Sequence, residues 1–289
     1  MKLPISVIVL TYNEEANIEA CLQSVCDLVE EIFIVDSFST DKTLDIVKKY
    51  TDKILQHKFE NYGKQRNWSL DNLPIKTKWI LNLDADHRVT NELNDELIEV
   101  FADPEKLNHD GFLISRKTIF MGRWIKHGGH YPVYHGILFK HGYGRCEESL
   151  YDQHFVIKGK HKKLTMNIED IFTESLLEFT LRHNRWSTFE AINQSTNPSS
   201  IIQENNNLTG KILGNTMERR RFFKTNIYMK LPLFCRSFIY FFYRYLFKLG
   251  FLDGKEGLIF HFLQGFWFRF LIDAKIYEMK KNTKSDSKL

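Results

Sequence analysis

The feature that most constrains the fold of this 289-residue chain is a set of short, almost wholly apolar runs that each stop at a polar residue. Three such runs, residues 5–10, 31–35 and 79–83, end at Thr11, Asp36 and Asp84. A continuous apolar run is typical of a strand buried on both faces in a parallel sheet. Because ligands bind at the carboxyl ends of the strands in open α/β sheets, we expect a polar site there.

Segments with helical spacing separate these runs. We predict helices over residues 14–28, 39–50, 62–73 and 90–101, with a short strand over 53–57. Ser39 or Thr40 can cap the second helix and Thr90 the last. The alternation predicts an α/β fold with a mostly parallel sheet and right-handed crossovers.

After Asp110 the pattern changes. We expect strands over 111–120 and 137–140, a loop rich in Gly, His and Tyr over 122–136, a polar irregular segment over 147–154 and a helix over 176–196. We therefore place one domain at residues 1–200 and a helical region at 201–289.

The composition is that of an ordered globular protein, and a net charge of +4 gives no reason to expect a nucleic-acid partner. The four cysteines form no CxxC pair, which favours packed thiols in a reducing compartment. The first residues run directly into a predicted strand, so we expect no signal peptide.

Asp84 and Asp86 stand two residues apart after the apolar run. Two carboxylates in this position suit a divalent metal beside a diphosphate. Asp86 would coordinate Mn²⁺ or Mg²⁺, whose charge offsets that of a leaving diphosphate, and Asp84 would serve the metal or a ribose hydroxyl. The alternative is a strand-end turn in which both Asp residues bond the local backbone.

The ends of the first two strands offer groups for a nucleoside. Asp36 can accept hydrogen bonds from a ribose or a uracil N–H, or it can cap the following helix. After Thr11, Tyr12 can lie along a base and Glu14 can accept from it. Asn13 can contribute to this site or cap a helix. Arg66 suits a phosphate or a base, although it equally suits a solvated helix face.

The motifs "SVIVLTYNEE", "IFIVDSFSTDKT", "GKQRN", "WILNLDAD" and "GRWIKHGGHYP" occur in this order. Together they resemble the family 2 inverting glycosyltransferases, above all the bacterial members of lipopolysaccharide-core and surface-polysaccharide synthesis. The resemblance covers about residues 3–155 and, more loosely, the C-terminal segment.

The resemblance implies a GT-A fold, a UDP-linked sugar donor and Mn²⁺ or Mg²⁺ at Asp84 and Asp86. It assigns donor contacts to Thr11, Tyr12, Asn13, Glu14, Asp36 and Arg66. The donor half would span about residues 1–105 and the acceptor half 106–200. This chain has Ser37-Phe38 where many relatives have glycines, and His87 where many closer ones have Glu.

Inversion requires a general base that deprotonates the acceptor hydroxyl. The candidates are Glu147, Glu148 and Asp152; we favour Asp152, with Glu148 second. His154 can orient the base, although a lone His more often has no catalytic role. The alternative is a polar loop without a catalytic role.

Trp124, His127 and His130 occupy the Gly-rich loop. We expect them to line the acceptor or close over the donor, because aromatic rings stack on sugars and glycines allow movement. Zinc binding by the two histidines is an alternative.

The C-terminal region combines Phe and Tyr with Arg and Lys, and its apolar runs are too short to span a bilayer. Phe234, Phe238 and Phe241 share a stripe, while Arg236 and Arg244 lie on another face. We expect contact with an anionic membrane surface. Packing on the first domain, or on another subunit of a homo-oligomer, is the alternative.

These observations favour an inverting, metal-dependent glycosyltransferase on the cytoplasmic face of the cell membrane. It would move a hexose or N-acetylhexosamine from a UDP-sugar to a lipid-linked or surface-polysaccharide acceptor. A sugar-phosphate nucleotidyltransferase would carry a Gly-rich basic loop after the first strand, where this chain has Thr-Tyr-Asn-Glu-Glu. A non-catalytic nucleotide-binding scaffold at the membrane is the other alternative. A dehydrogenase is disfavoured, because no GxGxxG follows the first strand.

Overall fold

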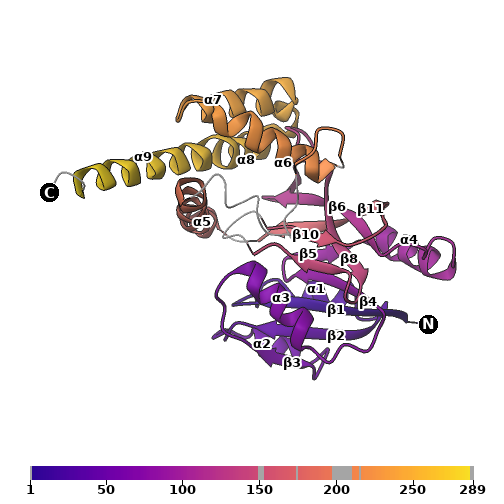
Figure 1. The fold of residues 1–289 in the computed structure, drawn as a ribbon. Coiled ribbons are helices and arrows are strands. Elements are labelled where there is room, and N and C mark those ends of the chain that lie inside the picture. The colour runs from indigo at the N-terminus through magenta and orange to yellow at the C-terminus, as the bar shows by residue number, and fades with distance from the viewer. Residues whose placement is uncertain (1, 149–152, 174, 197–209, 215, 287–289) are drawn as a thin grey trace. The chain divides into compact units, whose positions relative to one another are not determined.

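The computed structural model describes residues 2–148, 153–173, 175–196, 210–214 and 216–286, and they form two compact units (Figure 1). Among the described residues, the first unit holds 2–119, 132–148 and 153–173, and the second holds 120–131 and those from 175 onward. The helix predicted over 176–196 therefore groups with the C-terminal helices.

The first unit is built on a mixed sheet of order β3-β2-β1-β4-β8-β6-β11-β5. The strands in this order are β1 (Leu3–Thr11), β2 (Val29–Asp36), β3 (Ile54–Gln56), β4 (Trp79–Asp84), β5 (His87–Val89), β6 (Gly111–Phe120), β8 (Val133–Lys140) and β11 (His161–Phe172). The half from β3 to β4 is parallel, and β8 runs antiparallel to β4 and β6. A hairpin of β9 (Gly144–Cys146) and β10 (Phe155–Ile157) lies outside this sheet.

The α/β architecture predicted from the apolar runs is confirmed, and those runs form the core. Residues 5–9 of β1, 32–36 of β2 and 79–83 of β4 are buried regardless of which sheet face they occupy. The helices of this unit are α1 (Ile18–Gln23), α2 (Thr43–Val47), α3 (Tyr62–Asn72) and α4 (Asn91–Ala102). As predicted, Thr90 caps α4 by accepting from the Leu93 N–H (3.2 Å).

Sequence patterns missed several strands, among them β11 and β5, which pair antiparallel with each other. The signal for β11 was present as a period of two, because Leu164, Met166 and Ile168 alternate with more polar residues.

The second unit is helical: α5 (Leu176–Thr196), α6 (Thr216–Asn226), η2 (Tyr228–Lys230), α7 (Cys235–Phe242), η3 (Tyr243–Phe247), η4 (Gly250–Asp253), α8 (Gly254–Phe260), η5 (His261–Trp267) and α9 (Phe268–Asp286). Ala191 of α5 packs with Phe268, Ile272 and Ile276 of α9 in a small core. No described helix of the chain is long and apolar enough to cross a bilayer.

Arg236 and Arg244, which helical spacing placed on another face than the Phe stripe, are both buried. The Arg236 Nε donates to the fully buried carboxylate of Asp273 (2.7 Å). The Arg244 Nε donates to the Gly128 carbonyl (2.7 Å). These internal acceptors satisfy the guanidinium groups, so the helices turn their charged side inward.

Asp253 holds the first part of the Gly-rich loop, which belongs to this second unit up to Tyr131. Its carboxylate accepts from the His127 N–H (2.9 Å) and the Lys126 N–H (3.3 Å), and contacts the His127 Nδ1 (2.6 Å). Gly128 has a positive φ of 66°, and a Cβ there would lie 2.2 Å from the His261 ring. The loop is therefore shaped by the C-terminal helices, although it precedes them by more than a hundred residues.

Candidate functional site

The register of the parallel strands brings three predicted residues to one edge of the sheet. Thr11 pairs with Asp36 across β1 and β2, and Leu10 pairs with Asp84 across β1 and β4. The carboxyl ends of β2, β1 and β4 therefore form a continuous polar edge, as the apolar runs predicted.

Asp84 is held by two side chains of α3. Its Oδ1 accepts from the Arg66 Nη2 (2.5 Å), and the Tyr62 hydroxyl lies 3.2 Å from the same oxygen. Burial by itself raises the pKa of the Asp84 carboxyl, but the nearby positive charges, Arg66 foremost, and the hydrogen bond from Arg66 together outweigh it and hold that pKa below its usual value. Asp84 is consequently an anion with a fixed orientation.

Arg66 is fully buried and bonds the framework of the sheet. Its guanidinium donates to the Ile8 carbonyl (3.2 Å) and the Leu83 carbonyl (2.7 Å), which joins β1 to β4 beneath the edge. This geometry favours a positioning role through Asp84. A direct contact between Arg66 and a donor phosphate or base stays a prediction.

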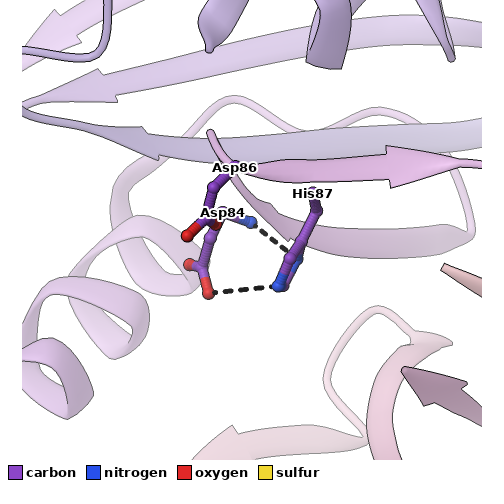
Figure 2. A group of neighbouring side chains, drawn as sticks. All are labelled: Asp84, Asp86 and His87. Carbon is purple, nitrogen blue, oxygen red and sulfur yellow. Dashed lines mark hydrogen bonds and ion pairs between the residues drawn. The ribbon is translucent and has the colours of Figure 1, made fainter. Parts of the chain in front are cut away.

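His87 supports the same carboxylate from the other side. Its Nδ1 accepts from the Asp84 N–H (3.1 Å), and its Nε2 lies 3.7 Å from the Asp84 Oδ2 (Figure 2). Burial lowers the pKa of His87, despite the opposing effect of Asp84. The ring is therefore neutral at pH 7, and because Nδ1 accepts, its proton sits on Nε2.

Asp84, Asp86 and His87 form a group that could hold a metal ion, since one ligand atom from each lies within 4.8 Å of the others. Figure 2 shows the two carboxylates side by side at the end of β4. Carboxylate oxygens suit Mg²⁺ or Mn²⁺. Both nitrogens of His87 are occupied, one by the Asp84 N–H and one by a proton, so the donor set that fits is the pair of carboxylates.

Sequence patterns missed a second ion pair beside this group. Arg116 of β6 lies 3.3 Å from the buried carboxylate of Asp170 on β11, and Asp170 pairs with His87 in the sheet. Burial lowers the pKa of Arg116, but Asp170, Asp86 and Asp84 outweigh it and raise that pKa. The sequence sign of this ion pair was Arg116, a charged residue within the largely apolar run of β6.

The loop after β1 is bonded to the loop after β2. The Asn13 Oδ1 accepts from the Thr40 N–H (2.8 Å), and the Glu14 N–H donates to the Thr43 hydroxyl (2.8 Å). Asn13 thus ties two loops together instead of capping α1, which begins only at Ile18. Tyr12 is 59% exposed at this edge, as a ring that stacks on a base must be.

Asp36 is fully buried and bonded to its surroundings. It accepts from the Thr11 hydroxyl (3.1 Å), the Ser39 N–H (2.9 Å) and the Gln56 amide (3.1 Å). The local capping role is therefore present, and a contact with ribose or base stays a prediction.

α3 also contacts the segment after β9, which contains the candidates for the catalytic base. The amide of Asn67 donates to the Glu148 Oε1 (3.1 Å) and exchanges hydrogen bonds with the backbone of Cys146. Glu148 is exposed, whereas Glu147 is buried and accepts from the His154 N–H (3.0 Å). Asp152 lies outside the described residues.

Trp124, His127 and His130 lie in the second unit. Trp124 ends the short strand β7 (Arg123–Trp124), and the two histidines follow on the loop that Asp253 holds. The Trp124 ring packs edge-on against Tyr131 (5.0 Å between centroids), and the His130 ring against Phe260 (4.8 Å). Within the described residues, the two histidines belong to no group of three potential metal ligands, so the zinc alternative gains no support. Their contact with a sugar stays a prediction.

Comparison with known proteins identifies the family. Residues 6–165, more than half of the chain, match the family described as Glycosyl transferase family 2. The chain belongs to this family. Its mixed sheet with a parallel N-terminal half and flanking helices is the GT-A fold, as the motifs predicted.

Curated relatives agree with this assignment. An uncharacterized glycosyltransferase of Rickettsia bellii is 36% identical over 120 residues, which cover 41% of this chain and 39% of the relative. The lipopolysaccharide core biosynthesis glycosyltransferase LpsC of Rhizobium meliloti is 31% identical over 126 residues, 42% of this chain and 45% of the relative. The matches thus span about two fifths of the relatives' own length.

Among solved structures, S. aureus TarS in complex with UDP superposes with a TM-score of 0.48 at 17% identity, covering 98% of this chain and 92% of TarS. Glucosyl-3-phosphoglycerate synthase of Mycobacterium tuberculosis, solved with Mn²⁺ and UDP, gives a TM-score of 0.32 at 21% identity over 40% of this chain and 44% of its own.

Proposed function

We propose that this protein is an inverting glycosyltransferase that moves a hexose or N-acetylhexosamine from a UDP-sugar to a lipid-linked or surface-polysaccharide acceptor. The observation that carries the proposal is the pair Asp84 and Asp86 at the end of β4, within a family 2 chain. Asp84 is oriented by Arg66, Tyr62 and His87.

The donor would lie along the polar edge of the sheet, with the base against Tyr12 and the diphosphate at Asp84 and Asp86. Thr11, Asn13, Glu14 and Asp36 shape the nucleoside end of this edge. Mn²⁺ or Mg²⁺ bound to the two carboxylates would supply positive charge next to the leaving diphosphate.

A carboxylate from the segment after β9 would take the proton of the acceptor hydroxyl as that oxygen forms its bond to the anomeric carbon. The bond from the anomeric carbon to the diphosphate breaks on the opposite face, which inverts the configuration. Asp152 and Glu148 remain the candidates, and the Asn67 contact supports Glu148.

Two rival functions make different predictions. A sugar-phosphate nucleotidyltransferase would release pyrophosphate from a nucleoside triphosphate and a sugar phosphate. A non-catalytic scaffold would bind UDP without transfer or hydrolysis. Family membership and the acidic loop after β1 favour the transferase.

The metal site can be tested by measuring how UDP raises the thermal stability of the protein with Mn²⁺ or with EDTA. A ligand at a hundred times its dissociation constant stabilises the native state by about 2.7 kcal/mol. We expect a Mn²⁺-dependent shift in the wild type and in Asp95→Asn, an exposed control on α4, and none in Asp86→Asn. A full shift in Asp86→Asn would reject the metal assignment. Loss of transfer in Asp152→Ala or Glu148→Ala, with UDP binding retained, would identify the base.

A further inference from the structure

α7 and η3 form an inside-out helix, with charged side chains turned inward and apolar ones turned outward. Two rows at four-residue spacing are exposed, with exposed fractions from 47% to 78%: Phe238, Phe242 and Leu246 in one, and Ile239, Tyr243 and Phe247 in the other. The row on the other side contains the buried Arg236 and Arg244. This arrangement is the reverse of what water favours at a protein surface.

The apolar exposure continues past η3. Leu249, Phe251, Leu252, Leu258 and Phe262 are each between 45% and 49% exposed. Exposed aromatic and aliphatic side chains thus recur through residues 238–262, which we call the apolar face.

We propose that the apolar face inserts into the interfacial region of an anionic lipid bilayer. The structure does not favour a purely electrostatic contact, because Arg236 and Arg244 are committed to internal acceptors. Burial of exposed Phe and Leu side chains in the acyl boundary supplies the attraction instead.

The charge around the apolar face favours lipid over a second copy of the chain. Within residues 227–263, all of which the structure describes, the exposed charged side chains are the lysines Lys230, Lys248 and Lys255. Of the two acidic residues, Asp253 is buried and Glu256 lies 3.9 Å from Arg123. A two-fold dimer would bring lysine rims together, whereas anionic headgroups complement them.

Lys248 shows how one such lysine would lie at the interface. Its ammonium group is 5.6 Å from the centroid of the Tyr243 ring, next to the most exposed phenylalanine, Phe247. A Lys beside an aromatic ring at the edge of an apolar surface keeps its charge in the headgroup layer while its stem and neighbours are buried.

This inference deepens the proposed function, on which its biological purpose rests, because a lipid-linked acceptor lies in such a surface. Lipid binding itself requires neither a sugar donor nor catalysis. An experiment can therefore reject the lipid-binding proposal without rejecting the glycosyltransferase proposal, and the reverse.

The test is co-sedimentation of the full chain with phosphatidylcholine vesicles containing or lacking phosphatidylglycerol, at low salt and at high salt. We expect binding to the anionic vesicles that largely survives high salt, because apolar insertion is not screened. Leu246→Ser and Phe247→Ser should each lower the partition coefficient about tenfold or more. Ile98→Ser on α4, where Ile98 is as exposed as Leu246, should bind like the wild type.

Three results would overturn the proposal. One is the absence of vesicle binding by protein that still shows its UDP-dependent thermal shift. Another is binding that Leu246→Ser and Phe247→Ser leave unchanged. The third is a lipid-free dimer, seen by analytical ultracentrifugation, that either substitution dissociates, because the face would then be a contact between two copies.

Discussion

At the scale of single residues, Phe38 has a backbone conformation that its side chain disfavours. Its φ is +63°, in the left-handed region where Gly is tolerated and β-carbon-bearing residues are strained. Glycine has no β-carbon, so it would adopt this conformation without that strain.

We expect Phe38→Gly to raise the free energy of unfolding, by about 1 kcal/mol, because it removes this strain. Urea denaturation measures the change. Phe59 is a matched control, since it is also 53% exposed but has no positive φ, and Phe59→Gly should destabilise. A loss of stability in Phe38→Gly would show that the ring makes contacts worth more than the strain.

Arg116 and Asp170 should behave as a pair. Arg116→Gln leaves the carboxylate of Asp170 buried without its counter-charge, so we expect a loss of about 2–3 kcal/mol in the free energy of unfolding. The double variant with Asp170→Asn should recover part of that loss, because the uncompensated charge is gone. Additive effects in a double-mutant cycle would contradict a direct interaction.

At the scale of elements, Glu31 joins β2 to its neighbours. Its carboxylate accepts from the Ser6 hydroxyl of β1 (2.7 Å), from Lys53 (2.5 Å) and from the Lys76 N–H (3.2 Å). Burial alone raises the pKa of Glu31, but these contacts outweigh it and lower that pKa.

A lowered native-state pKa means that the unfolded chain binds the proton first as the pH falls. The stability from Glu31 is therefore complete above about pH 5 and is lost as the pH falls below the usual value of about 4.3. Glu31→Gln should cost about 1–2 kcal/mol at pH 7 and flatten the acid decline of stability. The exposed neighbour variant Glu30→Gln should leave the urea midpoint at each pH unchanged.

The hydrogen bonds from the Gly-rich loop to Asp253 should protect the backbone amides of that loop from hydrogen exchange. Asp253→Asn removes the charge that accepts the Lys126 and His127 N–H groups, so their hydrogen exchange should accelerate about tenfold. Glu256→Gln, three residues away and only loosely paired with Arg123, should leave those two amides unaffected. Equal exchange in both variants would mean that Asp253 does not hold the loop.

At the scale of the whole molecule, β1, β2 and β4 were predictable because each contains a continuous apolar run that stops at a polar residue. The polar edge followed from them, since parallel strands end on the same side. The support beneath that edge was not predictable. Tyr62 and Asn67 come from α3, Arg116 from β6 and Asp170 from β11, and only tertiary packing shows which carboxylate or backbone group each one bonds.

For the second unit, the sequence showed the pattern but not its orientation. The stripe of Phe and the row of Arg could be recognised in the sequence, but the sequence did not show which of the two faces the interior. Periodicity separates the apolar face of a helix from its charged face. It does not show which face is buried, because the charged face can be buried where the folded protein supplies hydrogen-bond acceptors. Asp273 and the Gly128 carbonyl are such acceptors, and both are remote in sequence from the arginines they bind.

α3 carries a constraint on how this chain can vary in length. Arg66 and Asn67 are consecutive, yet one bonds Asp84 and the other bonds Glu148. Each residue in an α-helix is turned by about 100° from the previous one, so inserting or deleting a residue between Asn61 and Arg66 would rotate both side chains away at once. Homologues with an altered spacing there should have lost both contacts together, whereas gaps in the loop before Asn61 should be tolerated.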